Sequence, residues 1–574
     1  PVDTRFWNAV TRQDITSLTD ELGIAETAAL PELLPALSAW RERRHTESAL
    51  QEWRYRISWR RLTDLPPPRS TGTWIVVAPS APEAAAETTG VLAALARCGA
   101  RAHLVTVGPD GDGDAVGDTG VHADAGAALR AALGATDTAP AGVLSLLALD
   151  GRPHPGRPEL TVGLTGTVRL IQTLAEEDAE GRAAAEATAG VGVGVGTRLW
   201  CVTRGAVATD RTEAVTDPAQ AQIWGLGRVA ALEHPRRWGG LADLPAAPDG
   251  TAYDRLCAVV TGGAPQTGSA GRTGRIGGAG RIGGAGEDQV AIRPGGVLGR
   301  RLIRAAASAP APASATSADG GWQPRGTVLI TGGTGGIGAH VARRLAAEGA
   351  EHLVLVSRSG ADGAEAARLV AELGARVTVA ACDVTDRHAV TELVARVSAE
   401  GHPIRSVLHA AGISRHAALA DTTPDEIADT LAAKTTGAAV LHEVFADTEL
   451  DAFVLFSSIA GVWGSGGQAA YAAANAYLDA LAEHRRARGL PATSVAWGAW
   501  AGVGMATVGD AAERLRARGI TVMDPDRAVA ALRRAVAEDE PQVTVADVDW
   551  DRFVPLFTGA RPSRLLDELP EAVD

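Results

Sequence analysis

Residues 327–338 read TVLITGGTGGIG and decide the fold. A short apolar strand over 327–330 leads into a glycine-rich turn, and a helical pattern over 339–349 follows. The turn satisfies both T-G-x-x-x-G-x-G and G-x-G-x-x-G, whose glycines let the backbone approach a pyrophosphate held at the helix N-terminus. The stretch therefore predicts a dinucleotide site, with these candidate cofactor-binding residues: Gly332, Gly333, Thr334, Gly335, Gly336 and Ile337.

Buried-strand patterns recur beyond this turn, and helical patterns separate them. This alternation predicts an α/β fold with a doubly wound parallel sheet. The candidate strands lie at 327–330, 352–356, 376–381, 406–409, 452–457, 494–497 and 543–546.

The ends of the next strands supply further candidate contacts to the cofactor. Arg358 follows the second strand and lies 20 residues after Gly338. An acidic residue there holds the ribose 2′-hydroxyl of NAD, whereas an arginine accommodates the 2′-phosphate of NADP, so we predict NADPH. The alternative is a solvated arginine in a chain with 54 basic residues. The other candidates are Ser357, Asp383 (placed to meet the adenine), Val384, Ala410, Ala411 and Gly412.

An earlier α/β alternation starts near residue 55 but lacks the phosphate turn. Its first strand is followed by APSAP at 78–82, which contains no glycine. This part therefore predicts a dinucleotide-type fold without the dinucleotide site. Its buried strands are predicted at 74–77, 103–105, 143–147 and 199–202.

Residues 261–322 are predicted to be a linker. The hexamer RIGGAG occurs twice in tandem, at 275–280 and 281–286, and an Ala/Pro/Ser tract follows at 306–318. Such compositions form no core. One strand-like island at 289–293 interrupts them.

The first 50 residues predict short helices. Their apolar residues have helical spacing, and Pro31 and Pro35 divide the pattern. Because such a segment cannot bury its apolar stripe alone, it is expected to pack on a neighbour or on a second copy of the chain.

Composition narrows the function classes. The 54 basic and 68 acidic residues give a net charge of −14, which argues against a nucleic-acid footprint or a polybasic membrane patch. No apolar run reaches the roughly 18 residues of a membrane span, and no signal peptide is evident. The cysteines lack metal-binding spacing, so no metal site and a reduced, cytoplasmic location are expected. Because position 1 is Pro, we expect a piece of a longer protein.

Rare residues converge after the glycine turn. Lys434 is the only lysine in the chain. Tyr471 lies 13 residues after Ser458, and Asn475 lies four residues after Tyr471, so the last two share one face of a helix. Each residue alone is more often structural, as a packed aromatic, a turn serine or a cap. Together they favour a catalytic set.

This set suits the reduction of a ketone. Hydride addition builds charge on the carbonyl oxygen, which then needs a proton donor and a second hydrogen bond. Tyr471 is the candidate acid, and Ser458 is the candidate hydrogen-bond donor. The ordinary tyrosine pKa of about 10 is high for proton transfer at neutral pH, so Lys434 is expected to lower it and to hold the nicotinamide ribose. Asn475 is expected to orient Lys434 or a relay water.

From Thr327 onward, the sequence resembles the short-chain dehydrogenase/reductase superfamily, and more closely the ketoreductase domain of a modular polyketide synthase. In this branch, the catalytic lysine comes from an earlier helix and asparagine lies four residues after the tyrosine, which Lys434 and Asn475 match. The segment YRISW at 55–59 is similar to the opening of the family's structural subdomain.

The resemblance implies three parts. Residues 1–50 would form a helical dimerisation element. Residues 51–322, including the linker, would form a structural subdomain with a truncated Rossmann fold, and 323–574 a catalytic Rossmann subdomain that binds NADPH.

Single-residue markers of the family imply a stereochemical class. B-type members have L-D-D soon after the H-x-A-G turn, whereas this chain has Ser-Arg-His at 414–416. A-type members have tryptophan eight residues before the tyrosine, which is Trp463 here. Epimerising A-types tend to have histidine three residues before it, where this chain has Gln468. The resemblance implies a non-epimerising A-type enzyme and points to Met505 as a contact of the acyl chain.

The implied function is NADPH-dependent reduction of a β-ketoacyl thioester on an acyl carrier protein to the L-hydroxy product. The implied partners are that carrier protein, neighbouring domains of the same synthase module and a second copy of the chain through residues 1–50. No nucleic-acid or membrane partner is expected. The alternative is a reductase-inactive scaffold, dimerisation or epimerase domain of the same assembly line.

Overall fold

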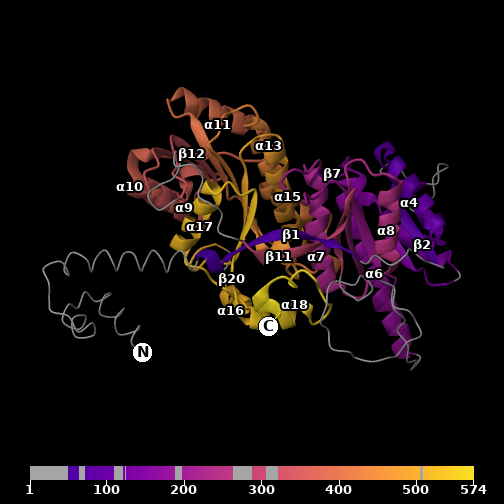
Figure 1. Ribbon diagram of the computed structural model, residues 1–574. Coiled ribbons are helices and arrows are strands. Elements are labelled where there is room, and N and C mark those ends of the chain that lie inside the picture. Colours follow the sequence, from indigo (N-terminus) through magenta and orange to yellow (C-terminus); the bar gives the residue numbers. More distant parts are fainter. Residues whose placement is uncertain are drawn as a thin grey trace, which may run out of the picture.

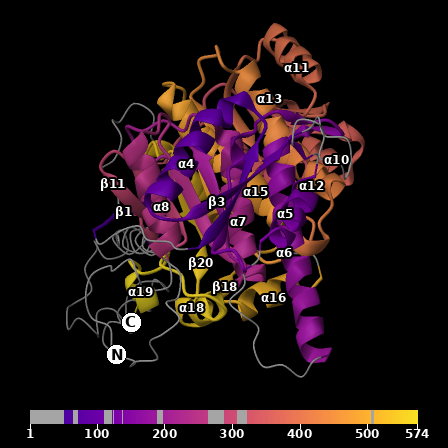
Figure 2. The ribbon, with the colours of Figure 1, turned by 90° about the vertical axis from the view of Figure 1, so that its right-hand side faces the viewer.

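The computed structural model contains one continuous mixed sheet of sixteen strands, in which the order is β14-β13-β12-β15-β16-β17-β19-β1-β11-β10-β9-β8-β5-β2-β3-β4 (Figures 1 and 2). We call residues 50–305 the N-terminal half and residues 321–573 the C-terminal half. The structure describes residues 50–63, 72–108, 121–122, 124–136, 138–187, 197–262, 287–305, 321–504 and 509–573.

The C-terminal half confirms the predicted doubly wound sheet. Its first strand, β12, lies in the interior of the half-sheet, and all neighbouring strands of this half are parallel. Every strand predicted here is present. The strands are β12 (Thr327–Thr331), β13 (His352–Ser357), β14 (Val377–Ala381), β15 (Ile404–His409), β16 (Ala452–Ser458), β17 (Thr493–Trp497) and β19 (Gln542–Val545), and a separate pair consists of β18 (Ile520–Thr521) and β20 (Asp547–Val548).

Helices connect these strands. A π-helical turn at Ala432–Thr436 joins two of them, α12 and α13. The helices are α9 (Gly336–Ala347), α10 (Ala364–Leu373), α11 (Arg387–Ala399), α12 (Pro424–Leu431), α13 (Gly437–Val444), α14 (Ile459–Trp463), α15 (Ala469–Ala487), α16 (Ala511–Ala517), α17 (Pro525–Ala537), α18 (Trp550–Thr558) and α19 (Pro570–Val573).

The N-terminal half repeats the parallel arrangement, and its four predicted strands are present. Alternate residues of β2 face opposite sides: Trp74 and Val76 pack with α4 and α8, and Ile75 and Val77 pack with α5, α6 and α7. Its strands are β2 (Thr73–Pro79), β3 (Arg101–Val107), β4 (Val121–His122), β5 (Gly142–Ser145), β8 (Leu199–Arg204) and β9 (Trp238–Leu244), with a hairpin of β6 (Pro153–His154) and β7 (Arg157–Thr161). Its helices are α4 (Ala85–Arg97), α5 (Ala125–Gly134), α6 (Val162–Ala187), α7 (Ala221–Glu233) and α8 (Gly250–Gly262).

Antiparallel strands join the two halves. β1 (Arg54–Leu62) pairs along its length with β11 (Gly296–Arg304), and its first two residues pair with β19 on the other edge. β11 then pairs with β10 (Gln289–Arg293). In Figure 1, β1 is the indigo strand that crosses the centre of the molecule. The two predicted Rossmann-like units therefore share one sheet.

Within the predicted linker, β10 confirms the strand-like island at 289–293, whereas β11, which follows it at the junction of the halves, was not predicted. Two consecutive arginines, Arg300 and Arg301, interrupt the apolar pattern of β11. Both are buried, because Arg301 pairs with Glu287 at 2.5 Å and Arg300 donates to the carbonyl of Val462 at 2.8 Å. The tandem hexamers, the Ala/Pro/Ser tract and the helices predicted for the first 49 residues lie outside the described residues.

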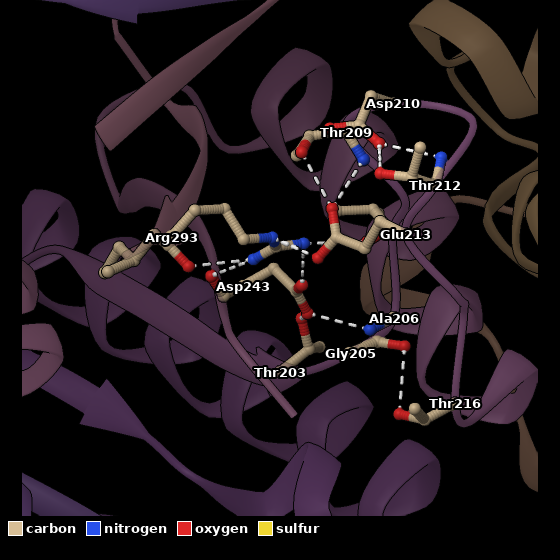
Figure 3. A network of polar contacts seen from close by, with 12 residues as sticks. Thr203, Gly205, Ala206, Thr209, Asp210, Thr212, Glu213, Thr216, Asp243 and Arg293 are labelled. Carbon is tan, nitrogen blue, oxygen red and sulfur yellow. Dashed lines mark hydrogen bonds and ion pairs between the residues drawn. The ribbon is translucent and has the colours of Figure 1, made fainter. Parts of the chain in front are cut away.

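A buried polar network lies at the carboxyl ends of β8 and β9 (Figure 3). The carboxylate of Asp243 accepts from the hydroxyl of Thr203 at 2.7 Å and from the amide of Ala206 at 2.9 Å, and it pairs with Arg293 at 2.9 Å. Arg293 also pairs with Glu213, which comes from the loop after β8. The N-terminal half thus has a closed ion-pair network at its strand ends, and no glycine turn follows β2.

In the described part of the chain, no helix combines the length and apolar character needed to cross a bilayer. In the same residues, no three His, Cys, Asp or Glu side chains are grouped so that they could hold a metal ion.

The join at β1 predicts an asymmetry between two of its arginines. Arg54 is fully buried and pairs with Glu538 and, at 2.7 Å, with Glu540, whereas Arg60 is exposed and pairs with Glu568. Arg54→Ala leaves the buried carboxylate of Glu540 without its cation, whereas Glu538 keeps Arg534 at 2.7 Å, so the free energy of unfolding in urea should fall by about 3–5 kcal/mol. Arg60→Ala should lower it by less than about 1 kcal/mol. Equal losses would contradict this account.

Candidate active site

The glycine turn connects β12 to α9 and packs against the residues that follow β15. Gly332 has φ +65°, and a Cβ there would lie 2.9 Å from the backbone of Ala411, so only glycine fits. α9 starts at Gly336, and no side chain caps its first turn. Uncapped N–H groups at a helix N-terminus suit an anion such as a pyrophosphate.

A cavity of about 980 Å³ is lined by members of both predicted sets, although Asn475 is not among its lining residues. Thr334 instead lines a neighbouring cavity of about 590 Å³, together with Gly336 and His340. Part of the cofactor set and three of the four catalytic candidates thus face one common space. The predicted residues that line the larger cavity are Gly332, Gly335, Gly336, Ile337, Ala410, Gly412, Lys434, Ser458, Trp463, Gln468 and Tyr471.

The candidates at the end of β13 lie beside the glycine turn. The amide of Gly333 donates to the carbonyl of Val356, the last but one residue of β13, at 3.3 Å. Ser357 is half-buried, and its hydroxyl donates to the carbonyl of Gly360 at 3.4 Å. Arg358 thus lies two residues after the strand residue that bonds to the turn, and its side chain is exposed to solvent.

Three other candidates differ in their surroundings. Asp383 is exposed, and its carboxylate accepts from the amide and hydroxyl of Thr385 at 3.0 and 2.8 Å. Val384 is buried in the core, and Ala411 is half-buried against the glycine turn. Met505 lies outside the described residues.

Lys434 lies in the π-helical turn and is buried. Its ammonium donates to the carbonyl of Phe456 on β16 at 2.7 Å and lies 5.4 Å from the centre of the Tyr471 ring. Burial lowers its pKa to about 8, and the carboxylate of Asp479 opposes that shift. The predicted proximity of the lysine and the tyrosine is therefore present.

Tyr471 and Asn475 lie on consecutive turns of α15, as predicted. The side-chain amide of Asn475 donates to the carbonyl of Tyr471 at 2.6 Å rather than to Lys434. Its Oδ1 atom is buried and has no hydrogen-bond partner among the described residues. Ser458 caps α14 and accepts from the amide of Ala460 at 3.2 Å.

The expected fall in the pKa of Tyr471 is not seen in this structure. Burial raises this pKa, and the nearby polar side chains of Ser458 and Asn475 oppose the rise. The prediction was wrong because it considered only the effect of the Lys434 charge on this pKa. It left out the effect of burial, which removes the phenol from water and raises the pKa. A raised pKa keeps the phenol protonated at neutral pH.

The two stereochemical candidates lie at opposite ends of one loop. Trp463 ends α14 and is buried against Trp550 and Phe553. Gln468 precedes α15, and its side-chain amide donates to the hydroxyl of Ser414 at 2.7 Å. Gln468 thus connects this loop to the segment where B-type members have L-D-D.

These residues fit a nicotinamide dinucleotide. The turn presents uncapped amides, Arg358 is exposed two residues after the strand residue that bonds to the turn, and the buried Oδ1 atom of Asn475 has no hydrogen-bond partner among the described residues. Residues of the turn would hold the pyrophosphate, and Lys434 is within the same cavity as the turn.

Comparisons with known proteins agree with this architecture. Residues 326–502 match the family model described as "KR domain", 3–46 match "Polyketide synthase dimerisation element domain", and 57–277 match "Polyketide synthase extender module SpnB, Rossmann fold domain". A solved structure described as an A-type ketoreductase from a modular polyketide synthase is 41% identical, with a TM-score of 0.76, over 92% of this chain and 99% of that chain. The chain belongs to the ketoreductases of modular polyketide synthases.

Other relatives extend the likeness. A C2-type ketoreductase structure is 42% identical, with a TM-score of 0.74, over 90% of this chain and 100% of its own. Polyketide synthase GfsA of Streptomyces halstedii is 48% identical over 100% of this chain, which spans only 7% of GfsA. Ketoreductases of this family are oxidoreductases of the short-chain dehydrogenase/reductase type.

Sequence reasoning missed His409 of this ketoreductase. Its Nδ1 atom lies 2.8 Å from the hydroxyl of Thr331 at the start of the glycine turn, and its Nε2 atom lies 3.1 Å from the carbonyl of Lys434. The fully buried ring therefore connects the cofactor turn to the backbone of the lysine. Its position in the HAAG motif was the available signal.

Sequence reasoning also missed residues of the N-terminal half. Arg228 of α7 donates to the carbonyl of Gly461 on α14, and Arg300 of β11 donates to that of Val462 at 2.8 Å. Both arginines also donate to the side chain of Gln289. An arginine inside the apolar pattern of α7 was the signal for a buried polar contact.

His409 predicts a pH dependence of stability. Burial and the nearby lysine lower its pKa to about 3, so it is neutral in the folded protein and takes up a proton on unfolding below its ordinary pKa. Stability should fall as the pH falls from about 6.5. Between about pH 6 and pH 4, the wild-type free energy of unfolding should fall by about 1.4 kcal/mol more per pH unit than that of His409→Asn. Parallel curves in urea titrations would rule this out.

Proposed function

We propose that this ketoreductase uses NADPH to reduce a β-ketoacyl thioester, carried on an acyl carrier protein, to the L-hydroxy product. The supporting observation is that the glycine turn, Lys434, Ser458 and Tyr471 line one cavity. A hydride donor and a ketone held there would be beside a phenol and a serine hydroxyl.

Each of these side chains has a separate role in the proposed reduction. Bound NADPH supplies the hydride to the carbonyl carbon. Tyr471 is protonated at neutral pH and gives its proton to the carbonyl oxygen, although burial raises its pKa and so makes it a weaker acid. The hydroxyl of Ser458 donates a hydrogen bond to that oxygen. Lys434, with a pKa of about 8, keeps most of its charge at neutral pH and stabilises the tyrosinate that results. Asn475 fixes the turn of α15 below Tyr471.

Three sequence markers support the stereochemical class. Trp463 and Gln468 both line the cavity, as do Ser458, which caps α14, and Tyr471 of α15. Gln468 is bonded to Ser414, which occupies the L-D-D position. We therefore propose a non-epimerising A-type enzyme.

Partners follow from the family and from the matched dimerisation element. We propose that residues 1–50, of which 3–46 match that element, pair two copies of the chain. The carrier protein and the neighbouring domains of the module are the other proposed partners, because each related synthase is much longer than this chain.

The function predicts a large loss on removing one hydroxyl. Tyr471→Phe should lower kcat with NADPH and a racemic 2-methyl-3-ketoacyl thioester by roughly 10²- to 10⁴-fold. Tyr477→Phe is the matched control, because Tyr477 lies on the same helix but in the core. Undiminished turnover of Tyr471→Phe would overturn the mechanism, and chiral analysis of the wild-type alcohol tests the L-configuration. A folded wild type that consumes no NADPH would favour the scaffold or epimerase alternative.

Cofactor choice is tested at Arg358. Arg358→Ala should raise KM for NADPH by roughly tenfold and leave KM for NADH unchanged, because a charge-assisted bond to the 2′-phosphate is lost. Arg368→Ala provides the control, since Arg368 is exposed on α10 and pairs with Glu365. If both variants keep the wild-type NADPH preference, Arg358 is a solvated arginine.

A further inference from the structure

Two loops of the C-terminal half form one wall of the cavity. We call residues 412–419 the first loop and residues 464–468 the second loop. The amide of Ala417 donates to the carbonyl of Gly467 at 2.9 Å, which joins the two loops. Gly412 and His416 of the first loop, and most of the second loop, line the cavity. The relative position of the loops therefore shapes the space beside Tyr471.

A carboxylate of the N-terminal half bridges these loops. Glu233, the last residue of α7, accepts from the amide of Gly467 at 2.6 Å and from the amide of Leu419 at 2.7 Å. Each carboxylate oxygen accepts from a different loop. The side chain of Gln172 on α6 reinforces the first loop, because it donates to the carbonyl of Leu419 at 3.2 Å.

The helix that presents Glu233 is held close to the site. A Cβ at Gly225 of α7 would collide with the carbonyl of Ala472, the residue after Tyr471. Arg228 of the same helix donates to Gly461 of α14. α7 packs along α15 between the two halves (Figure 1). The position of Glu233 is therefore fixed relative to α14 and α15.

We infer that Glu233 is a positioning residue that sets the spacing of the two loops, and thereby the affinity and the facial selectivity for the acyl substrate. This inference rests on the proposed function. A carboxylate accepts both amides at once, whereas a neutral amide side chain offers one oxygen acceptor and turns N–H groups toward the other loop. A small shift of the cavity wall formed by these loops changes how the ketone lies, and therefore which of its faces is turned toward the hydride donor.

Glu233 is bonded away from the main cofactor candidates. It bonds to Leu419 and Gly467, whereas the cofactor candidate Gly412 lies at the opposite end of the first loop from Leu419. The glycine turn and Arg358 lie in neither loop. Loss of its carboxylate should therefore act on the acyl substrate and leave the cofactor unaffected. A general structural role would instead weaken binding of both.

The experiment compares Glu233→Gln and Glu233→Ala with wild type in the full chain. With a racemic 2-methyl-3-ketoacyl thioester, KM for the thioester should rise roughly tenfold in Glu233→Gln and the fraction of minor alcohol isomers should increase. KM for NADPH should stay within about twofold, and amide hydrogen exchange should quicken only in the two loops. Asp425→Asn is the control, because it removes an exposed ion pair to Arg157 that also joins the halves; it should change none of these values.

The outcomes separate the two hypotheses. Unchanged thioester KM and isomer ratio in both Glu233 variants overturn the inference, as does an equal rise of both KM values. If the wild type reduces no ketone, the proposed function fails. The hydrogen-exchange measurement then still tests whether Glu233 holds the two loops together: faster exchange confined to the loops supports this role, and unchanged exchange refutes it.

Discussion

The antiparallel pairing of β1 with both β11 and β19 is the constraint on which the rest of the molecule depends. Each half has its own parallel strand order, and neither order specifies how the two halves meet. Because the backbone of β1 forms hydrogen bonds to strands of both halves, it makes them one sheet. Arg54, buried between Glu538 and Glu540, adds ion pairs at the end of β1 that meets β19.

This join determines which helices face each other. It places α7 of the N-terminal half against α15, so closely that Gly225 has no room for a side chain. Arg228 then reaches the backbone of Gly461, two residues before Trp463, and Glu233 reaches that of Gly467, one residue before Gln468. The N-terminal half has no glycine turn. It contributes to the proposed reaction by holding in place the segments that line the cavity beside Tyr471. Its own strand ends hold the closed network around Asp243.

Features that depend on neighbours in the chain were predictable from the sequence. The glycine turn, the parallel strands and the shared helix face of Tyr471 and Asn475 follow from local spacing. Contacts between distant segments were not predictable. β11 was missed because the flanking compositions indicated a linker, and because the bond from Arg300 to Val462 joins segments far apart in the chain. Glu233 looked like an ordinary helix end. The pKa of Tyr471 moved opposite to expectation, because burial is a property of the packed fold.

The lone lysine has a physical explanation in this structure. Elsewhere the chain uses arginine, even in buried positions such as Arg228. At position 434, the side chain passes so close to Gly412 that a Cβ there would lie 2.6 Å from its Cε atom, and its ammonium ends on one carbonyl, that of Phe456. A planar guanidinium has five donors and needs more space than this passage provides. A compact ammonium with a pKa of about 8 fits, and it brings a positive charge beside the Tyr471 ring. Composition and geometry therefore select the same residue.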